Sequence, residues 1–161
     1  MNRKQYNSAV NEFSERVFRY AFKWTKNEEL SKDIVQEIFE KLWNNRKKVE
    51  ASKVKSWLFT TTHNHLVNNS KKKKMVSRED LIFQEPCFKD NKYELQDLIE
   101  VALNTLPSVQ KSILLLRDSE GYDYKEIGDI LKLNESQVKV YLFRARKKIK
   151  NYLKDLAVLV A

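Results

Sequence analysis

Residues 124–143 read YKEIGDILKLNESQVKVYLF, and this stretch decides the fold expected for the C-terminal half of the chain. Its apolar residues recur at helical spacing on both sides of residues 132–134, which predicts two helices joined by a three-residue turn. Gly128 supplies the small residue needed where the first helix crosses the second. Asn134 is a favourable N-cap for the second helix, and Gln137 three residues later completes a capping box. The stretch therefore predicts a helix-turn-helix.

The second helix of this motif continues into a strongly basic segment. Residues 139–150 contain six basic side chains and no acidic one. Amides and cations on such a helix can reach base edges in the major groove, and further cations can contact phosphates. Considered alone, the basic segment also fits an ordinary solvated amphipathic helix. Combined with the helix-turn-helix, it favours a DNA-facing surface.

The composition of the whole chain supports an all-α fold. The 161 residues include two glycines and two prolines, too few for sandwiches, barrels or meanders, and too few for a Gly-rich phosphate loop. The single cysteine, Cys87, excludes an internal disulfide and a multi-cysteine zinc site. His63 and His65 are two positions apart and point away from each other on a helix, so they form a poor metal pair. We expect no metal, no cofactor and no catalytic residues.

The net charge of +9 is distributed unevenly. Residues 1–74 carry a net +9, residues 75–95 a net −2 and residues 96–161 a net +2. The middle segment has no clean periodicity, which predicts two small helical domains (1–74 and 96–161) joined by a flexible linker (75–95). The surplus of positive charge favours a polyanion as partner, with nucleic acid ahead of a membrane surface. With no apolar signal core and no run of about 18 apolar residues, a soluble, cytoplasmic protein without direct membrane insertion is expected.

Periodicity in the first half predicts three helices. The first extends from about Tyr6 to Trp24, the second begins after Asn27 as N-cap, and the third extends from about Ser52 to Asn69 and leads into four lysines. On the second helix, four polar residues at positions i, i+3, i+4 and i+7 share one face. These four residues are Asp33, Gln36, Glu37 and Glu40. An acidic face would repel DNA, so it is either a solvated surface or a docking site for a basic protein.

Several segments together resemble a known family. Residues 106–127, continued by Val138-Lys139 and by residues 144–146, resemble the fourth conserved region of bacterial sigma factors. Residues 33–39 with Leu42-Trp43 resemble the second conserved region of the same family. Residues 57–59, followed by Asn64, are similar to the part of that region that meets the −10 promoter element. Because no segment between the two blocks could form a third region, the chain resembles the extracytoplasmic-function (ECF) group.

The resemblance implies an initiation factor that directs RNA polymerase to two-part promoters. The second domain would read the −35 element as duplex DNA. The expected −35 contacts are Arg117, Gln137, Lys139, Val140, Phe143, Arg144 and Lys147. The first domain would hold the melted −10 element, with amides and an aromatic stacking surface for unpaired bases and lysines for phosphates. The expected −10 contacts are Phe59, Asn64, Asn68, Lys71, Lys72 and Lys73.

The resemblance also implies protein partners. The acidic face would dock on the clamp coiled coil of the largest subunit of core RNA polymerase, and an anti-sigma factor is a plausible regulator. The family usually has glycine at the position of Lys132, so either Lys132 adopts a strained left-handed backbone or the turn differs slightly from that of the family. Two alternatives remain. One is a dimeric helix-turn-helix regulator of a palindromic operator, whose first domain senses a ligand or pairs subunits. The other is a structural or RNA-binding helical protein.

Overall fold

The computed structural model describes residues 1–77 and 95–160, with side chains described for residues 1–72 and 97–157. No strand occurs in these two ranges, so the expected all-α class, with two helical domains, is confirmed. The first domain contains α1 (Arg3–Thr25), α2 (Glu28–Asn45), the short 3₁₀ turn η1 (Ala51–Lys53) and α3 (Val54–Ser77). The second contains α4 (Leu95–Asn104), α5 (Ser108–Leu114), the π-helical turn η2 (Leu115–Ser119), α6 (Tyr124–Leu131) and α7 (Glu135–Val160).

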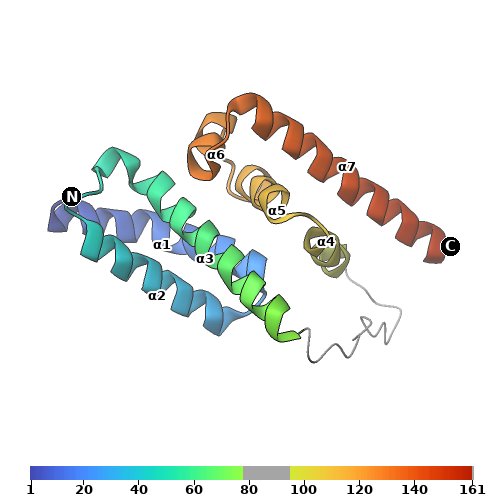
Figure 1. The fold of residues 1–161 in the computed structure, drawn as a ribbon, viewed down its shortest axis with the longest axis horizontal. Helices are drawn as coiled ribbons and strands as arrows, with labels where there is room; N and C mark the ends of the chain where they lie inside the picture. The colour runs from blue at the N-terminus through green and yellow to red at the C-terminus, as the bar shows by residue number, and fades with distance from the viewer. Residues whose placement is uncertain (78–94, 161) are drawn as a thin grey trace.

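The first domain is a bundle of three long helices, with α1 and α2 antiparallel and α3 lying along both (Figure 1). The apolar stripe of α1 forms the centre of its core, since Phe13, Val17 and Tyr20 are all buried. The link between α1 and α2 is short, and the Asn27 side chain caps α2 by accepting the Leu30 N–H at 2.9 Å, as predicted. These local signals set the antiparallel hairpin that presents the outer face of α2.

The third helix is longer than its sequence pattern suggested. It continues to Ser77 instead of ending near Asn69, and Lys71 and Lys72 are exposed on its last turns. Lysine is a good helix former, and its charge is favourable near a helix C-terminus. With no Gly or Pro before Pro86, nothing in the sequence stops the helix earlier. The expected linker spans 75–95, but residues 75–77 belong to α3 and Leu95 begins α4. The rest of that segment, residues 78–94 with Cys87, and the side chains of Lys73 and Lys74 lie outside the described residues.

Turn residues divide the second domain into its short helices. Pro107 is the N-cap of α5, because its ψ of 149° is extended and helical geometry begins only at Ser108. Gly121 ends the following segment at a φ of +73°, a conformation that glycine adopts without strain. The chain then turns sharply into the helix-turn-helix, which lies at the end of α7 farthest from the C-terminus (Figure 1).

The helix-turn-helix forms as predicted. The Asn134 Oδ1 atom accepts the Gln137 N–H at 2.8 Å, and the Gln137 side chain accepts the Asn134 N–H at 3.0 Å, which completes the capping box. A Cβ atom on Gly128 would lie 2.5 Å from the backbone oxygen of Leu133, so only glycine permits this crossing. Of the two alternatives for Lys132, the structure shows the left-handed backbone, with φ 61° and ψ 45°.

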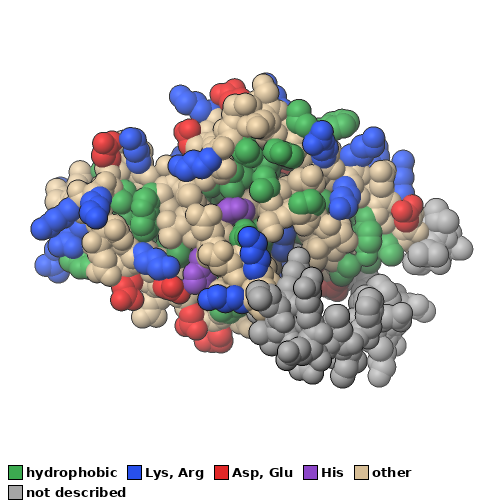
Figure 2. Space-filling model, in the orientation of Figure 1, with side chains coloured by type: hydrophobic (Ala, Val, Ile, Leu, Met, Phe, Trp, Pro, Cys, Tyr) green, Lys and Arg blue, Asp and Glu red, His purple; other side chains and the backbone are tan. Residues whose placement is uncertain are grey.

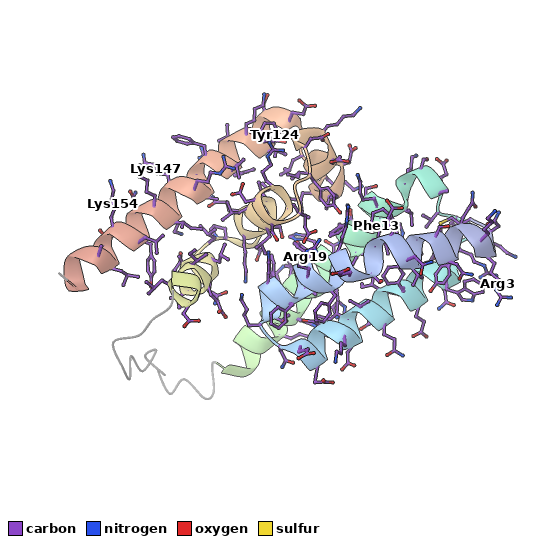
Figure 3. All side chains as sticks on the ribbon, turned by 180° about the vertical axis from the view of Figure 1, so that it is seen from behind. Arg3, Phe13, Arg19, Tyr124, Lys147 and Lys154 are labelled. Atoms are coloured by element: carbon purple, nitrogen blue, oxygen red, sulfur yellow. The ribbon has the colours of Figure 1, made fainter. Side chains whose placement is uncertain are left out.

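The two domains pack directly against each other. The Thr60 hydroxyl of α3 donates to the Ile130 carbonyl of α6 at 2.7 Å. Arg19 of α1 forms a bidentate ion pair with Glu120, at 3.0 and 2.9 Å, and lies on the edge of α1 next to the second domain (Figure 3). The Lys55–Glu126 ion pair joins α3 to α6. The domains therefore form a closed arrangement, which we define by these contacts.

Candidate nucleic-acid and polymerase interface

The first half of α7 presents an exposed surface suited to a DNA groove. Six of the seven side chains expected at the −35 element lie exposed along it. They are Gln137, Lys139, Val140, Phe143, Arg144 and Lys147. Phe143 is 68% exposed and Val140 is 47% exposed, although both are apolar. Exposed apolar side chains beside cations fit contact with thymine methyl groups and phosphates in a major groove. Lys147 points away from the body of the protein (Figure 3).

Arg117 lies on η2 rather than α7, and an aromatic ring connects it to this surface. Its guanidinium donates to the Tyr122 carbonyl at 2.9 Å and lies 4.9 Å from the centre of the Tyr124 ring. The Lys139 ammonium lies 5.5 Å from the same ring centre. Tyr124 therefore holds both cations near one position by cation–π attraction. Our sequence interpretation missed this role of Tyr124, whose only signal was an aromatic residue at the first position of α6.

A second pair fixes the orientation of α7. The Arg146 guanidinium contacts the carboxylate of Asp118 at 2.6 and 3.4 Å, joining α7 to η2. Both side chains are about half exposed, so this pair contributes little to global stability. Its fork geometry nevertheless restricts rotation of α7 about its axis. The Lys148 ammonium likewise donates to the Thr105 carbonyl at 3.0 Å. Two of the six cations of residues 139–150, Arg146 and Lys148, are therefore bonded to the protein in this arrangement.

A row of polar side chains follows one face of α3. Asn64 and Asn68 are both exposed and four residues apart, and Lys71 and Lys72 continue beyond them. Amides provide donors and acceptors for the edges of unpaired bases, and lysines neutralise phosphates. Four of the six expected −10 residues thus lie on exposed surface of one helix. The side chain of a fifth, Lys73, is outside the described residues.

Phe59 does not fit its expected role as a stacking surface in this arrangement. Its side chain is 0% exposed and packs between the two domains. The Tyr122 ring lies 5.2 Å away in an edge-to-face orientation, and the Tyr20 ring lies 5.7 Å away. The burial has a simple physical reason, because Phe59 lies on the side of α3 that the second domain covers. The sequence shows that Phe59 is an apolar residue on a helix, but helical spacing does not show which distant segment buries it.

The acidic face of α2 lies on the surface of the first domain. Asp33, Gln36, Glu37 and Glu40 are all exposed. Figure 2 shows acidic side chains gathered along the edge of the first domain that α2 forms, while Lys and Arg are spread over both domains. Glu37 pairs with Lys41 at 3.1 Å and with His65 of α3 at 3.6 Å. The acidic face therefore adjoins the face of α3 that carries the two asparagines.

Two further features bear on chemistry. In the described part of the chain no group of three or more His, Cys, Asp or Glu side chains is arranged to hold a metal ion. No helix in the described ranges is both long enough and apolar enough to cross a membrane. His65 lies against Glu37 and Asn69, whereas His63 lies at the domain junction.

Comparison with known proteins decides the family. A model of sigma-70 region 2 matches residues 9–75, and a model of sigma-70 region 4 matches residues 96–149. RNA polymerase sigma factor SigV of Bacillus subtilis (strain 168) is 31% identical over 156 residues, which cover 91% of this chain and 93% of SigV. The chain belongs to the ECF-type RNA polymerase sigma factors. It is therefore a non-catalytic sigma factor that directs RNA polymerase to promoters.

Other similarities agree with this sigma factor's fold. ECF RNA polymerase sigma factor SigM of Bacillus subtilis (strain 168) is 29% identical over 143 residues, covering 83% of this chain and 86% of SigM. A solved structure of the sigma factor RpoE from Bartonella quintana, in complex with the anti-sigma factor NepR, superposes with a TM-score of 0.72. That pair is 22% identical, with 94% of this chain and 98% of the other covered. Sigma factors bind core RNA polymerase and DNA, and the predicted family and general function are confirmed.

Proposed function

We propose that this sigma factor reads a two-part promoter with a division of labour between residues 1–74 and residues 96–161, joined by residues 75–95. The second domain binds the −35 element as duplex, and the first binds the −10 element as melted single strand. The observation that carries the proposal is the exposed face of α7, where Val140 and Phe143 lie among cations on a helix with a capped N-terminus.

In the −35 duplex, side chains near the start of α7 contact base edges and those farther along contact phosphates. Lys139 is placed by the Tyr124 ring it shares with Arg117. The Gln137 carbonyl oxygen is occupied by the capping box, so its amide N–H₂ group is the part available to a base. Lys147, one helical turn beyond Phe143, is suited to a phosphate contact.

In the −10 strand, Asn64 and Asn68 hold base edges while Lys71, Lys72 and Lys73 neutralise the backbone. Exposure of the two amides and of Lys71 and Lys72 supports this assignment. Phe59 can stack on a base only if the two domains separate, because the closed arrangement buries it completely.

The acidic face of α2 docks on the clamp coiled coil of the largest polymerase subunit. Four exposed polar residues on one helix face, three of them carboxylates, complement a basic partner helix. Because Glu37 contacts His65 of α3, this docking site adjoins the proposed −10 surface. A polymerase bound to α2 would thus hold the melted strand beside α3, the helix that reads it. As a partner of RNA polymerase, the protein would act in the cytoplasm.

The deciding experiment is run-off transcription with purified core polymerase on a randomised promoter library. We expect transcripts that depend on this protein and share two sequence elements, and a pre-melted −10 bubble should reduce the requirement for Asn64 and Asn68. If core polymerase together with this chain initiates no transcripts, and the protein alone binds a palindrome tightly, the results would instead support a dimeric operator-binding regulator.

An anti-sigma factor is the proposed regulatory partner, and an apolar groove between the domains is the proposed site. The groove has a volume of about 1030 Å³ and is lined by Phe22, Ile99, Leu103, Leu115, Ile149 and Leu153. Charged side chains of both signs also line the groove: the basic ones are Lys23, Lys26, Arg146, Lys150 and Lys154, and the acidic ones are Asp97, Glu100 and Asp118. Because Glu100 and Asp118 pair with Lys26 and Arg146, Lys23, Lys150 and Lys154 give the rim its basic character, which favours an amphipathic helix with some acidic side chains. Ile149→Asp should abolish inhibition by an anti-sigma factor in the run-off assay. Val140→Asp, outside the groove, should leave that inhibition intact and weaken promoter binding.

A further inference from the structure

A buried polar cluster lies at the junction of the two domains and has no part in the proposed promoter contacts. Ser112 of α5 inserts its hydroxyl between two side chains of the first domain. Its Oγ atom lies 2.7 Å from the Tyr20 hydroxyl of α1 and 2.5 Å from Nδ1 of His63 on α3. Ser112 is 0% exposed and Tyr20 is 1% exposed, so water does not satisfy these hydroxyls.

Counting protons assigns the direction of these hydrogen bonds. Each hydroxyl has one proton and needs an acceptor when buried. Both are satisfied if Tyr20 donates to Ser112 and Ser112 donates to an unprotonated Nδ1 of His63. If Nδ1 carries a proton, it becomes a donor, and one of the two buried hydroxyl protons has no acceptor among the partners in the described structure. The closed arrangement is therefore complete only with neutral His63.

The described surroundings of His63 offer no counter-charge to an imidazolium. The Trp24 ring of α1 packs against the His63 imidazole, with ring centres 6.0 Å apart. The Lys111 ammonium lies 4.4 Å from the centre of the same Trp24 ring. Lys111 is buried, and its ammonium is held by the Trp24 carbonyl at 3.3 Å and by Asn104 at 3.0 Å. In the described structure no carboxylate lies within ion-pair distance of His63, so an imidazolium there would be unpaired.

We propose that Tyr20, Ser112 and His63 form a proton-sensitive latch that holds the two domains closed, and that protonation of His63 opens them. Opening uncovers Phe59, which the closed arrangement buries against Tyr122. Acidification would thus convert a closed form into one in which the aromatic side chain of α3 is accessible. The latch is a property of the free protein and is tested without promoter or polymerase, so it can succeed or fail separately from the proposed promoter contacts.

The pH window follows from the direction of each shift. Burial lowers the pKa of His63 below its usual 6.5, so the closed arrangement binds fewer protons than the open one. Closure is fully favoured above pH 6.5 and weakens as the pH falls from there towards the closed-state pKa. The pKa of Lys111 is lowered to about 8, mainly by burial and also by the nearby Lys26, while Glu100 opposes the shift. The contribution of Lys111 to closure therefore depends on pH only above the range in which His63 titrates. The ion pair with Lys55 lowers the pKa of Glu126 below 4.5. The contribution of Glu126 to closure therefore depends on pH only below the range in which His63 titrates.

The experiment combines two measurements on the full chain between pH 8 and pH 4.8. The chain has two histidines, so NMR resolves their titrations, with His65 as an internal reference outside the junction. Small-angle scattering reports domain separation in the same samples, and circular dichroism checks that the helices remain. We expect the radius of gyration to rise at the pH where His63 gains its proton. The open-to-closed ratio should change tenfold per unit of difference between its open and closed pKa values.

Matched variants separate the latch from general acid effects. His63→Asn keeps an acceptor near the position of Nδ1 but cannot titrate, so it should remain closed at pH 4.8. His65→Asn should open as the wild type does. An open wild type at pH 8, a constant radius while His63 titrates, or equal opening of His63→Asn would each overturn the proposal. The wild-type pH series alone can contradict the proposal, so the test remains decisive even if a variant misfolds.

Discussion

The rings of Phe59 and Tyr122 meet edge to face, with centres 5.2 Å apart and an angle of 78° between their planes. Phe59 belongs to α3 of the first domain, and Tyr122 precedes α6 of the second. Both side chains are buried. A residue near the proposed −10 surface is therefore part of the apolar core between the domains, which links domain arrangement to DNA recognition in this sigma factor.

Phe59→Ala should lower the free energy of unfolding by about 3–5 kcal/mol, as expected for truncating a fully buried phenylalanine. Phe143→Ala is the matched control, because Phe143 is 68% exposed and its loss should change stability by less than about 0.5 kcal/mol. Urea denaturation of both variants measures the difference. Equal destabilisation would contradict the burial of Phe59.

Gly128→Ala should destabilise the second domain by about 1–3 kcal/mol, because the new Cβ would lie 2.5 Å from the Leu133 backbone oxygen. Gly121→Ala meets no atom within 4 Å but keeps a φ of +73°, so its cost should be limited to roughly 1–2 kcal/mol of backbone strain. Thermal denaturation and −35 duplex binding would be measured together. We expect Gly128→Ala to weaken DNA binding more, since it displaces α7 relative to α6.

Lys132→Gly should raise the free energy of unfolding by about 1 kcal/mol, because Lys132 has a φ of 61° and glycine removes that strain. Lys125→Gly is the control, since this exposed lysine lies inside α6 and should lose about 1 kcal/mol. Opposite signs in chemical denaturation are the expected result. A loss of stability in both variants would show that the left-handed turn carries no strain.

Combining Gln36→Ala with Glu37→Lys should reduce affinity for core polymerase at least tenfold while leaving the fold intact, because both side chains are exposed on the acidic face. The control pair Asn11→Ala with Glu12→Lys makes the same chemical change at exposed positions of α1. Affinity for core is measured by fluorescence anisotropy. Similar losses in the two pairs would show that net charge, rather than this face, determines docking.

Lys139→Ala should lose about 1–3 kcal/mol at one −35 position and relax its sequence preference. Lys147→Ala should weaken all duplexes about equally and reduce the slope of log affinity against log salt by about one. Binding of single-substitution −35 duplexes at several salt concentrations distinguishes the two effects. A uniform loss for Lys139→Ala would reassign that side chain to a phosphate contact.

Local features of the site were predictable because they depend on neighbours within one or two helical turns. The Asn134–Gln137 capping box and the Asn27 cap each join residues three positions apart. The exposed faces of α2 and α7 follow from the 3.6-residue period in the same way. The end of α3 was predicted less well, because helix propensity falls gradually through a lysine run and no residue there forces a stop.

The sequence by itself determined the two helical domains, the helix-turn-helix and the family, through periodicity, caps and motif order. The tertiary structure alone decided what covers Phe59, that Tyr124 gathers Arg117 and Lys139, and that Ser112 meets Tyr20 across 92 positions. An apolar or polar residue on a helix face indicates that something will contact it. The identity of that contact depends on how distant segments pack, and helical spacing carries no information about packing between segments.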